Sequence, residues 1–486
     1  MEEDFCRIFE TILNIEKVSA ADSFFDLGGT SLTATRVLIE AKNAGYEVAY
    51  SDVFSHPSAR DMAKLVGGND ADDYSDPEVT DYDYTKINAL LAENNLDSFR
   101  NGKRLALGDV LLTGANGYLG IHILHNLTEN HLEQNPQYKV YCLVRHGKNG
   151  VSSEARLRNL LFYYFENNYR ELFDTQLIVI DGDVTDPAAF EQVPATANGD
   201  VPLTVINCAA IVKHFSEGTE IEDINIGGLQ NCVDLCLKTG ARLIQTSTNS
   251  TGGLSVNGYP DPKTDFSEQL HYFGQSLTSK YTHSKFLAER IVLEAIIEKG
   301  LVAKVVRLGN LAPRVTDGEF QINFRSNSAM GRLHIFQMLG VCSYDIAMNR
   351  MEFSPIDEVA EAVLLLATTP RECCVFHPFN NHMVMLGDII REMADTLGID
   401  IEEVEAETFK ARLDEAAADP EKAKILQSML AYNATSKVKL AGFLKYNPYT
   451  IQVLARLGFH WDVTSWDYVQ RFIKAIAALD FFEDKR

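Results

Sequence analysis

The chain contains no long apolar run and comparatively little basic charge. No stretch of it approaches the roughly 18 consecutive apolar residues of a membrane-spanning helix. The acidic N-terminal sequence MEEDFCRIFE lacks the basic and apolar regions of a secretory signal. Lys and Arg number 44 against 68 Asp and Glu, for a formal charge of −24, whereas a nucleic-acid surface needs clustered cations. We therefore expect a cytoplasmic protein with no membrane anchor and no nucleic-acid partner.

Cysteine is scattered rather than paired. The eight cysteines form no CxxC pair and no Cys/His set at zinc spacing. The sequence therefore predicts neither a disulfide framework nor a metal site. Cys232 and Cys236 lie four residues apart in a predicted helix, and we interpret them as two small buried hydrophobic residues rather than as metal ligands.

Length and composition predict two or three globular domains. At 486 residues, 46% of them hydrophobic, the chain is longer than one core usually organises. Residues 1–66 carry apolar side chains at helical spacing and predict a small all-α bundle. Residues 67–84, with the sequence GGNDADDYSDPEVTDYDY, are acidic and almost free of aliphatic side chains, which predicts a flexible linker. Residues 85–486 then form a second, larger domain.

In the larger domain, short apolar runs alternate with helical stretches. Runs such as DVLLTGANGYLG, KVYCLVRH and ARLIQTST end in small or polar residues, as parallel strands do when ligands gather at their C-terminal ends. We predict an α/β fold with a Rossmann-type parallel sheet over residues 105–380. Residues 381–486 have a mainly helical pattern and predict a smaller substrate-binding subdomain. Trp461 and Trp466 belong either to its core or to its pocket.

One serine of the small bundle lies in a glycine-rich motif. The sequence DLGGTSL, residues 26–32, places two glycines before a helix that begins near Ser31. A Ser or Thr N-cap would explain this pattern by itself. Together with the size of the bundle and the later turn VFSHPS, however, the motif resembles the acyl and peptidyl carrier domains of nonribosomal peptide and polyketide synthases. The resemblance implies that Ser31 receives a covalent 4′-phosphopantetheine arm, at a helix start that suits a phosphodiester.

A second glycine motif follows the first predicted strand of the larger domain. In TGANGYLG, residues 113–120, Gly114 permits a tight turn, Gly117 lets the backbone approach a pyrophosphate, and Gly120 lets the helix pack on the strand. An ordinary glycine-rich turn is the alternative. The strand–turn–helix setting favours a dinucleotide site formed by Thr113, Gly114, Asn116, Gly117, Tyr118, Leu119 and Gly120.

The next predicted strand ends at Arg145, where an NAD-selective protein would carry Asp or Glu. A cation at this place favours the 2′-phosphate of NADPH. Arg156, on the following helix, would add a second cation. Either Arg by itself would usually be a solvated surface charge, so the NADPH preference depends on where the two residues lie relative to the dinucleotide.

Tyr281 and Lys285 are four residues apart in the sequence YTHSK. On a helix they share one face, and the cation lowers the pKa of the phenol toward the range useful in proton transfer. A surface Tyr and Lys would give the same spacing by chance. Downstream of the dinucleotide motif and of Ser247-Thr248, however, the set resembles the extended short-chain dehydrogenase/reductase family over residues 105–380.

This resemblance assigns roles to several side chains. It implies that Thr248 and Tyr281 hold a carbonyl oxygen, and that Lys285 binds the nicotinamide ribose and tunes Tyr281. Ser247 remains an alternative to Thr248, and Asn225 is either the structural or water-holding Asn of the family or a helix cap. Leu308 stands where relatives commonly have Pro. The further cofactor contacts implied by the resemblance are Asp183 and Val184 on the adenine side, Ala209 at a strand end and Asn310 on the nicotinamide side.

The order of the two halves indicates a family of proteins more specifically than either half does alone. A carrier joined to such a reductase resembles the terminal thiolation-reductase pair of nonribosomal peptide synthetases, and the similar ends of carboxylic acid and aminoadipate reductases. The resemblance implies an NADPH-dependent thioester reductase. It would release a peptidyl or acyl thioester from Ser31 as an aldehyde, with further reduction to the alcohol left open. Upstream synthetase domains and a phosphopantetheinyl transferase would be its partners.

Two other functions are compatible with the sequence. An epimerase or dehydratase of the same extended family would retain and recycle its nicotinamide. A redox-silent docking module would bind a partner without turnover, although the Thr-Tyr-Lys set argues against that function. A thioesterase or acyltransferase is disfavoured because the sequence has no GxSxG motif.

Overall fold

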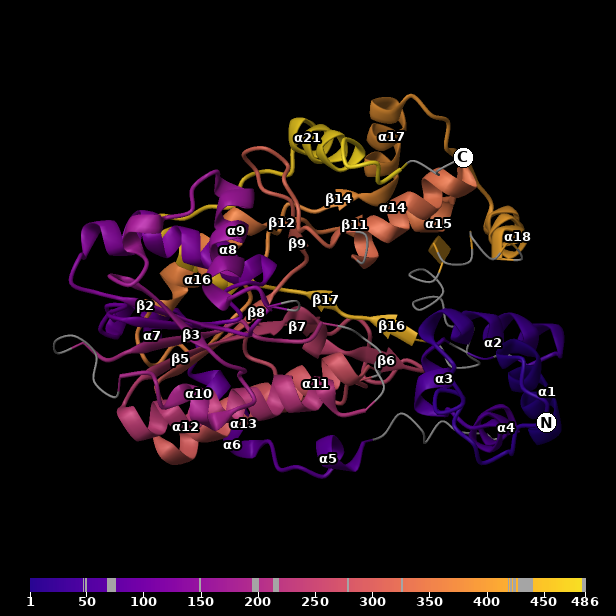
Figure 1. Cartoon of the computed structure of the whole chain (residues 1–486), viewed down its shortest axis with the longest axis horizontal. Helices are drawn as coiled ribbons and strands as arrows, with labels where there is room; N and C mark the ends of the chain where they lie inside the picture. The colour runs from indigo at the N-terminus through magenta and orange to yellow at the C-terminus, as the bar shows by residue number, and fades with distance from the viewer. Residues whose placement is uncertain are drawn as a thin grey trace.

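The computed structural model comprises a small helical bundle beside a larger α/β body (Figure 1). It describes residues 1–46, 48, 50–67, 76–147, 150–194, 201–212, 218–277, 279–324, 327–417, 419, 422, 425–426 and 440–482. Within these residues no helix combines the length and the apolar character needed to cross a membrane.

The described part of residues 1–67 folds as a helical bundle. Its helices are α1 (Glu2–Leu13), α2 (Ser31–Asn43), α3 (Tyr50–Ser55) and α4 (Ala59–Gly67). Phe5 and Phe9 recur at helical spacing along α1 and are buried in one core with Phe24, Val37 and Met62. The bundle predicted from the apolar spacing is confirmed.

A parallel sheet forms the centre of the larger body. Among the described residues it contains β1 (Val110–Thr113), β2 (Val140–Val144), β3 (Leu177–Asp181), β4 (Thr204–Asn207), β5 (Arg242–Thr248), β8 (Ala303–Leu308) and β13 (Val375–Phe376). The strand order is β13-β8-β5-β4-β1-β2-β3, and each pairing is parallel. Every residue of β1 and of β5 is buried, as parallel strands are when both faces are covered. The predicted Rossmann-type sheet is confirmed.

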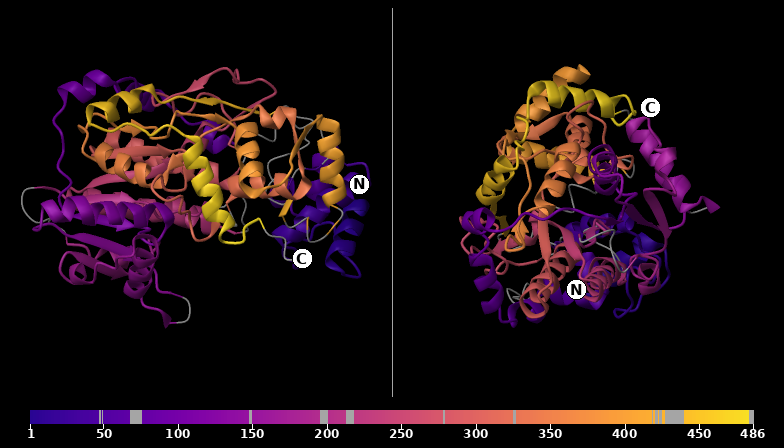
Figure 2. Two further views of the ribbon diagram at one scale, coloured as in Figure 1. Left: turned by 90° about the horizontal axis from the view of Figure 1, so that it is seen from above. Right: turned by 90° about the vertical axis from the view of Figure 1, so that its left-hand side faces the viewer.

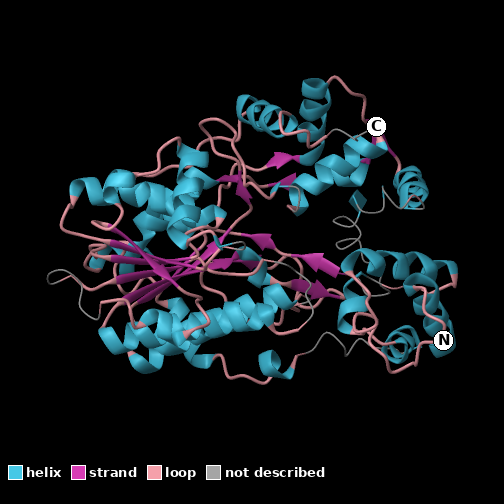
Figure 3. Ribbon diagram, in the orientation of Figure 1, coloured by secondary structure: helices cyan, strands magenta, loops and turns pink. Residues whose placement is uncertain are grey.

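Helices cover both faces of this sheet (Figure 3). Along β1, Val110 and Leu112 point into one core and Leu111 into the other, because side chains alternate along a strand. The first core is closed by α8 (Tyr118–Asn126), α9 (Ser153–Phe165), α16 (Ile356–Ala367) and α20 (Pro448–Arg456). The second is closed by α6 (Thr85–Ala92), α12 (Gly228–Thr239) and α13 (Lys280–Lys299). Cys232 and Cys236 of α12 are buried in the second core, in agreement with the interpretation of these two residues as hydrophobic.

A third core lies in a subdomain above the sheet. It is built from α14 (Ser328–Leu339), α15 (Tyr344–Ala347), α17 (Leu386–Leu397), α18 (Ala406–Ala417), α21 (Trp466–Ala477) and the short strands β10 (Val341–Ser343) and β15 (Glu402–Val404). Residues 328–351 therefore pack with this subdomain although they precede residue 381, and α20 packs with the sheet although it follows. Trp461 lies in the core of the sheet body, whereas Trp466 is 43% exposed.

Residues 76–84 pack on α13, although they fall within the linker predicted over residues 67–84. Val79 and Tyr84 are buried, and Arg290 of α13 lies over the Tyr82 ring at 4.7 Å and donates to the carbonyl oxygen of Glu78 at 2.8 Å. The tyrosines supply apolar area that a count of aliphatic residues overlooks. Residues 68–75 of the predicted linker lie outside the described residues.

The bundle lies off the edge of the sheet at which the strands end, with short strand pairs between the two (Figures 1 and 2). From that edge β6 (Leu254–Val256) extends beyond β5 and pairs with β16 (Leu440–Gly442), next to α2 and α3 in Figure 1. β7 (Asp265–Phe266) pairs in turn with β17 (Leu444–Lys445). The bundle also contacts α18, where Lys42 Nζ of α2 lies 2.8 Å from a carboxylate oxygen of Asp414.

We expect Gly120→Ala to destabilise the sheet body by about 1–3 kcal/mol. A Cβ at Gly120 would lie 2.1 Å from the carbonyl oxygen of Gly114, and this main-chain atom cannot retreat without opening the turn. Denaturant unfolding followed by circular dichroism measures the loss. Gly227→Ala is the matched control, because a Cβ there meets nothing within 4 Å and Ala favours a helix. Equal stability of the two variants would contradict the packing argument.

Candidate active site

Ser31 is the first residue of α2. Thr30 precedes it as the N-cap, in a reciprocal pair in which Thr33 N donates to Thr30 Oγ1 at 3.2 Å and Thr30 N donates to Thr33 Oγ1 at 2.7 Å. Gly28 has a φ of +95°, and a Cβ on Gly29 would come within 2.4 Å of a neighbouring aromatic ring. The turn therefore requires both glycines, and Thr30 rather than Ser31 supplies the cap.

The glycine-rich turn connects β1 to α8. Gly114 has a φ of +67°, and a Cβ there would lie 2.7 Å from the main-chain nitrogen of Ala209. Gly117 is exposed and is the N-cap of α8, with no side-chain cap. The first N–H groups of the helix are thus presented to a phosphate group. Tyr118, which begins α8, donates from its hydroxyl to the carbonyl oxygen of Ala312 at 3.1 Å. This turn fits a pyrophosphate.

Arg145 lies immediately after β2, and its side chain is 63% exposed. Its guanidinium is 3.6 Å from Asp183 Oδ2. Arg156 of α9 donates to the carbonyl oxygens of Arg145 and His146 at 2.5 and 3.3 Å, so it shapes the loop that carries Arg145. Asp183 also accepts hydrogen bonds from the main chain and hydroxyl of Thr185. The structure brings Arg145, Arg156 and Asp183 together at the ends of β2 and β3.

Val184 and Ala209 follow the ends of β3 and β4. Val184 packs against Gly228 of α12, where a Cβ would lie 2.7 Å from the Val184 side chain. Ala209 N lies 3.3 Å from Thr113 Oγ1 as a hydrogen-bond donor. Both residues therefore border the same edge of the sheet as the glycine-rich turn.

Buried polar groups form a chain across this edge. Thr113 Oγ1 donates to Asn207 Oδ1 at 2.5 Å, and Asn207 Nδ2 donates to Gln245 Oε1 at 2.8 Å. Gln245 Nε2 donates to the carbonyl oxygen of Thr246 at 2.8 Å, and that oxygen also accepts from Lys285 Nζ at 3.0 Å. The chain fixes Lys285 relative to the glycine-rich turn. Sequence reasoning missed Asn207 and Gln245, which belong to no motif.

Lys285 is 3% exposed. Burial lowers the pKa of its ammonium to about 8, although nearby Cys208 and Glu289 act in the opposite direction. At pH 7 Lys285 is therefore still protonated in most molecules. The site therefore holds a positive charge one helical turn from Tyr281, in surroundings where charge interacts strongly.

Asn225 holds the first turn of α13, which carries Tyr281. Its Nδ2 donates to Ser284 Oγ at 3.0 Å, and its side chain also bonds the main-chain N–H and carbonyl oxygen of Ile211. Ser284 Oγ in turn donates to the carbonyl oxygen of Tyr281 at 2.9 Å. Asn225 lies inside the π-helical turn η5 (Asp223–Gly227), so it braces the Tyr281 turn rather than capping a helix.

Ser247 and Thr248 project from opposite faces of β5, as successive strand residues do. Ser247 Oγ donates to Glu289 Oε1 at 2.5 Å, and Arg307 binds the same carboxylate at 2.7 Å. Ser247 is therefore part of a buried ion-pair cluster. Thr248 Oγ1 accepts from Ser250 N at 3.1 Å at the start of η6 (Asn249–Gly252). The geometry favours Thr248 as the hydroxyl of the site.

The segment after β8 reaches the same edge. Leu308 pairs with Thr248 in the β5–β8 register, so Asn310 follows two residues beyond that pair and is exposed. Asn310 N donates to Glu352 Oε2 at 2.8 Å. Burial raises the pKa of Glu352 to about 7. Sequence reasoning missed Glu352, because its segment carries no recognisable motif.

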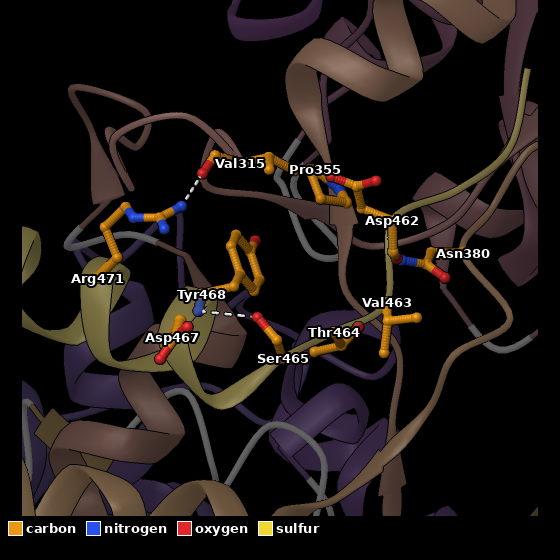
Figure 4. Close-up of a pocket in the computed structure, with 10 residues that line it drawn as sticks. All are labelled: Val315, Pro355, Asn380, Asp462, Val463, Thr464, Ser465, Asp467, Tyr468 and Arg471. Carbon is orange, nitrogen blue, oxygen red and sulfur yellow. Dashed lines mark hydrogen bonds between the residues drawn. The ribbon is translucent and has the colours of Figure 1, made fainter.

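A cavity of about 240 Å³ lies between Pro355 of β12 (Ser354–Pro355) and the first half of α21 with the residues that precede it (Figure 4). Its lining includes Val315, Pro355, Asn380, Thr464 and Arg471. None of the site residues predicted from the sequence lines this cavity. The cavity is therefore separate from the residues that the sequence singles out.

Two known families match the sequence. The family described as phosphopantetheine attachment site matches residues 3–66, and the family described as male sterility protein matches residues 112–363. The second match covers more than half of the chain and includes the glycine-rich turn, Thr248, Tyr281 and Lys285.

One solved structure matches the whole chain, and another matches its larger part. A thiolation-reductase di-domain from an archaeal non-ribosomal peptide synthetase is 35% identical, with 99% of this chain and 98% of that chain covered and a TM-score of 0.85. The reductase domain of the aureusimine biosynthetic cluster is 22% identical and has the same fold, with a TM-score of 0.64 over 82% of this chain and 98% of that chain.

Curated relatives are longer proteins. The L-2-aminoadipate reductase large subunit of Candida glabrata is 24% identical over 83% of this chain and 30% of its own length. A linear gramicidin synthase of Brevibacillus parabrevis is 24% identical over 84% of this chain and 8% of its own length. The chain thus spans less than a third of either relative.

We expect the affinity for a nicotinamide dinucleotide to fall as pH rises above about 8, because Lys285 then loses its proton and an anionic ligand favours the protonated form. Lys285→Met should weaken binding at least about tenfold at neutral pH and remove this alkaline decline. Fluorescence titration of the dinucleotide measures both effects.

Lys304→Met is the matched control for this measurement. Burial lowers the pKa of Lys304 to about 8 as well, but its Nζ donates to the carbonyl oxygens of Pro370 and Cys373, away from the site. The variant should keep the alkaline decline. An alkaline decline that persists in Lys285→Met would rule out Lys285 as its source.

Proposed function

This chain belongs to the male sterility protein family, and from that premise we propose that it is an NADPH-dependent thioester reductase. It releases a peptidyl or acyl group carried at Ser31 as an aldehyde. One observation carries the proposal: the chain joins a bundle matched as a phosphopantetheine attachment site to a body in which Lys285 of α13, the helix of Tyr281, bonds the end of β5, the strand of Thr248. The archaeal thiolation-reductase di-domain combines the same two parts.

The residues present fit the two groups that the reaction needs. The main chain of Gly114 and Gly117 would hold the pyrophosphate, Arg145 the 2′-phosphate and Lys285 the nicotinamide ribose. When bound, the nicotinamide supplies a hydride to the thioester carbonyl carbon. The 4′-phosphopantetheine on Ser31 supplies the thiol that carries the acyl group.

The side chains of the site act on the carbonyl oxygen. Thr248 and Tyr281 donate hydrogen bonds to it, and negative charge develops there during reduction. Donors fixed in advance at such a position are each worth about 3 kcal/mol in the transition state. Tyr281 gives its proton to the oxygen, and the ammonium of Lys285 stabilises the phenolate that remains. Asn225 and Ser284 keep Tyr281 in place by holding the first turn of its helix.

The overall reaction balances with one cofactor and one proton per aldehyde. The carbonyl carbon gains one hydride. When the carbon–sulfur bond breaks, the oxygen returns its proton to Tyr281 and the freed thiolate takes up one proton from solvent. Because the substrate is attached to the same chain, it need not be captured from dilute solution. A weak contact between bundle and reductase is therefore sufficient, and the exposed Lys42–Asp414 pair is of that kind.

The proposal divides the chain into a carrier domain (1–66), a linker (67–84) whose residues 76–84 pack on α13, and a reductase (85–486). The reductase comprises the sheet body (105–380) and the substrate-binding subdomain (381–486), with α14 and α15 packing into the subdomain and α20 into the sheet body. A phosphopantetheinyl transferase modifies Ser31, and upstream synthetase domains supply the acyl or peptidyl thioester. The similarity to linear gramicidin synthase and aminoadipate reductase supports these partners.

The direct test loads Ser31 enzymatically with a simple acyl-pantetheine, adds NADPH and identifies the released product by mass. We expect an aldehyde or alcohol, formed with stoichiometric loss of NADPH. An epimerase or dehydratase would recycle its nicotinamide and consume none. A docking module would release nothing. Either of those results would refute the proposal.

Tyr281→Phe should lower NADPH oxidation by at least about 100-fold while Ser31 is still loaded, because the proton donor is removed without disturbing the bundle. Absorbance of NADPH measures turnover, and intact-protein mass measures loading. Tyr163→Phe is the control, since Tyr163 of α9 is 46% exposed and its hydroxyl donates to Glu319 at 2.9 Å. A fully active Tyr281→Phe enzyme would remove Tyr281 from the mechanism.

Arg145→Glu should weaken NADPH binding at least about tenfold and NADH binding far less, because only NADPH places a phosphate beside this side chain. Titration with both cofactors gives the ratio. The control is Arg158→Glu on α9, where Arg158 forms an intrahelical pair with Glu154 at 3.2 Å. An unchanged NADPH-to-NADH ratio in Arg145→Glu would refute the assignment.

A further inference from the structure

Glu352 is a buried carboxyl group beneath the segment that follows β8. It is 7% exposed. Oε2 accepts from Asn310 N at 2.8 Å, and Oε1 accepts from the hydroxyl of Ser354. A Cβ on Gly309 would lie 2.3 Å from Oε1. Any side chain at position 309 would therefore collide with the carboxylate. The main chain at Gly309 and the Glu352 side chain are in close contact only because residue 309 is a glycine.

The same hydrogen bonds extend to the C-terminal part of the chain. Ser354 Oγ accepts from Asn380 N at 2.9 Å, and Ser354 N donates to the carbonyl oxygen of Asn310 at 3.1 Å. Asn380 Nδ2 donates to the carbonyl oxygen of Asp462 at 2.9 Å. Glu352 thus lies at the centre of a network that joins the end of β8 to the segment preceding α21.

The segment held by Glu352 borders the site at both ends. It begins after Leu308, which is in register with Thr248. Two residues past Asn310, the carbonyl oxygen of Ala312 accepts from the Tyr118 hydroxyl, and Tyr118 begins the helix that follows the glycine-rich turn. The segment therefore spans from the Thr248 end of β5 to the dinucleotide-binding turn.

We propose that Glu352 is a positioning residue for the dinucleotide: its carboxylate holds the Asn310 segment in the conformation that closes this side of the cofactor cleft. The inference rests on the proposed function, since it assumes that a dinucleotide binds at the sheet edge. Glu352 acts through Asn310 and touches neither substrate nor cofactor.

The hydrogen-bond pattern favours the ionised carboxyl. Both oxygens accept, one from Asn310 N and the other from the Ser354 hydroxyl. A proton on Glu352 would reverse the bond to Ser354 and leave a neutral carboxyl, which is a weaker acceptor than a carboxylate, opposite Asn310 N. Burial raises the pKa of Glu352 to about 7, while Lys445 of β17 lowers it. Tyr468 of α21 also faces Glu352, and burial raises the pKa of its phenol well above the ordinary value, so it stays neutral.

Affinity for the dinucleotide should therefore fall as pH falls through about 7. The sign is that of a carboxylate whose ionised form supports binding. This acid decline is opposite in direction to the alkaline decline expected from Lys285, so affinity should be highest between the two pKa values.

The test is fluorescence titration of NADPH on the full chain without loading of Ser31, between about pH 6 and pH 8. Glu352→Gln keeps the size of the side chain but cannot ionise. We expect it to bind about tenfold more weakly than the natural chain at the upper pH, and to lack the acid decline. The 2′-phosphate of NADPH titrates in the same range for every variant, so differences between variants isolate Glu352.

Glu358→Gln is the matched control. Burial raises the pKa of Glu358 to about 8, and it accepts from Asp462 N at 2.8 Å, but it makes no contact with Asn310. It should retain the acid decline of the natural chain. If Glu358→Gln abolishes the decline, or if Glu352→Gln binds as the natural chain does at both pH values, the proposal is overturned.

Ser354→Ala keeps the test decisive should Glu352→Gln fail to fold. It removes one hydrogen bond to the ionised carboxyl, so the midpoint of the acid decline should move to higher pH. An unchanged midpoint of the acid decline would contradict the proposed role of Glu352. Because binding is measured without thioester, a chain that fails to reduce thioester but shows these shifts would refute the proposed function and leave the role of Glu352 standing.

Discussion

The hydrogen bond from the buried ammonium of Lys285 to the carbonyl oxygen of Thr246 is the contact on which the site depends. It fastens α13 to the end of β5, and the same oxygen closes the polar chain that reaches the glycine-rich turn. A cation buried this deeply is costly unless it is hydrogen bonded. The position of the helix that carries Tyr281 is therefore tied to the glycine-rich turn, because the charge of Lys285 must be hydrogen bonded.

Much of this arrangement follows from local sequence. The alternation of apolar runs predicted the parallel sheet, and the glycines of the 113–120 motif, by their steric needs, predicted the turn between β1 and α8. The YTHSK spacing placed Tyr281 and Lys285 on one helical face, as α13 shows. These features are encoded within a few residues of one another, so a single stretch of sequence suffices to recognise them.

What the sequence did not predict depends on distant partners. Thr113 and Asn207 are 94 residues apart, and Asn310 and Glu352 are 42 apart. The third core includes α14, which precedes residue 381, whereas α20, which follows residue 381, packs with the sheet. Apolar periodicity identifies a helix but not the core that it joins. The packing of Val79 and Tyr84 escaped notice because acidic neighbours outnumber the apolar residues of that segment.

The attachment of residues 76–84 to α13 has a mechanical consequence. His283 and Arg290 pair with Asp76 and Glu78. Both belong to α13, the helix that also carries Tyr281 and Lys285. The described end of the segment between the bundle and the larger body is thus attached to the helix that carries Tyr281, and not to the subdomain built around α17 and α21. A movement of that subdomain relative to the sheet would therefore leave the distance between this attachment and the Tyr281 turn unchanged, because both belong to α13.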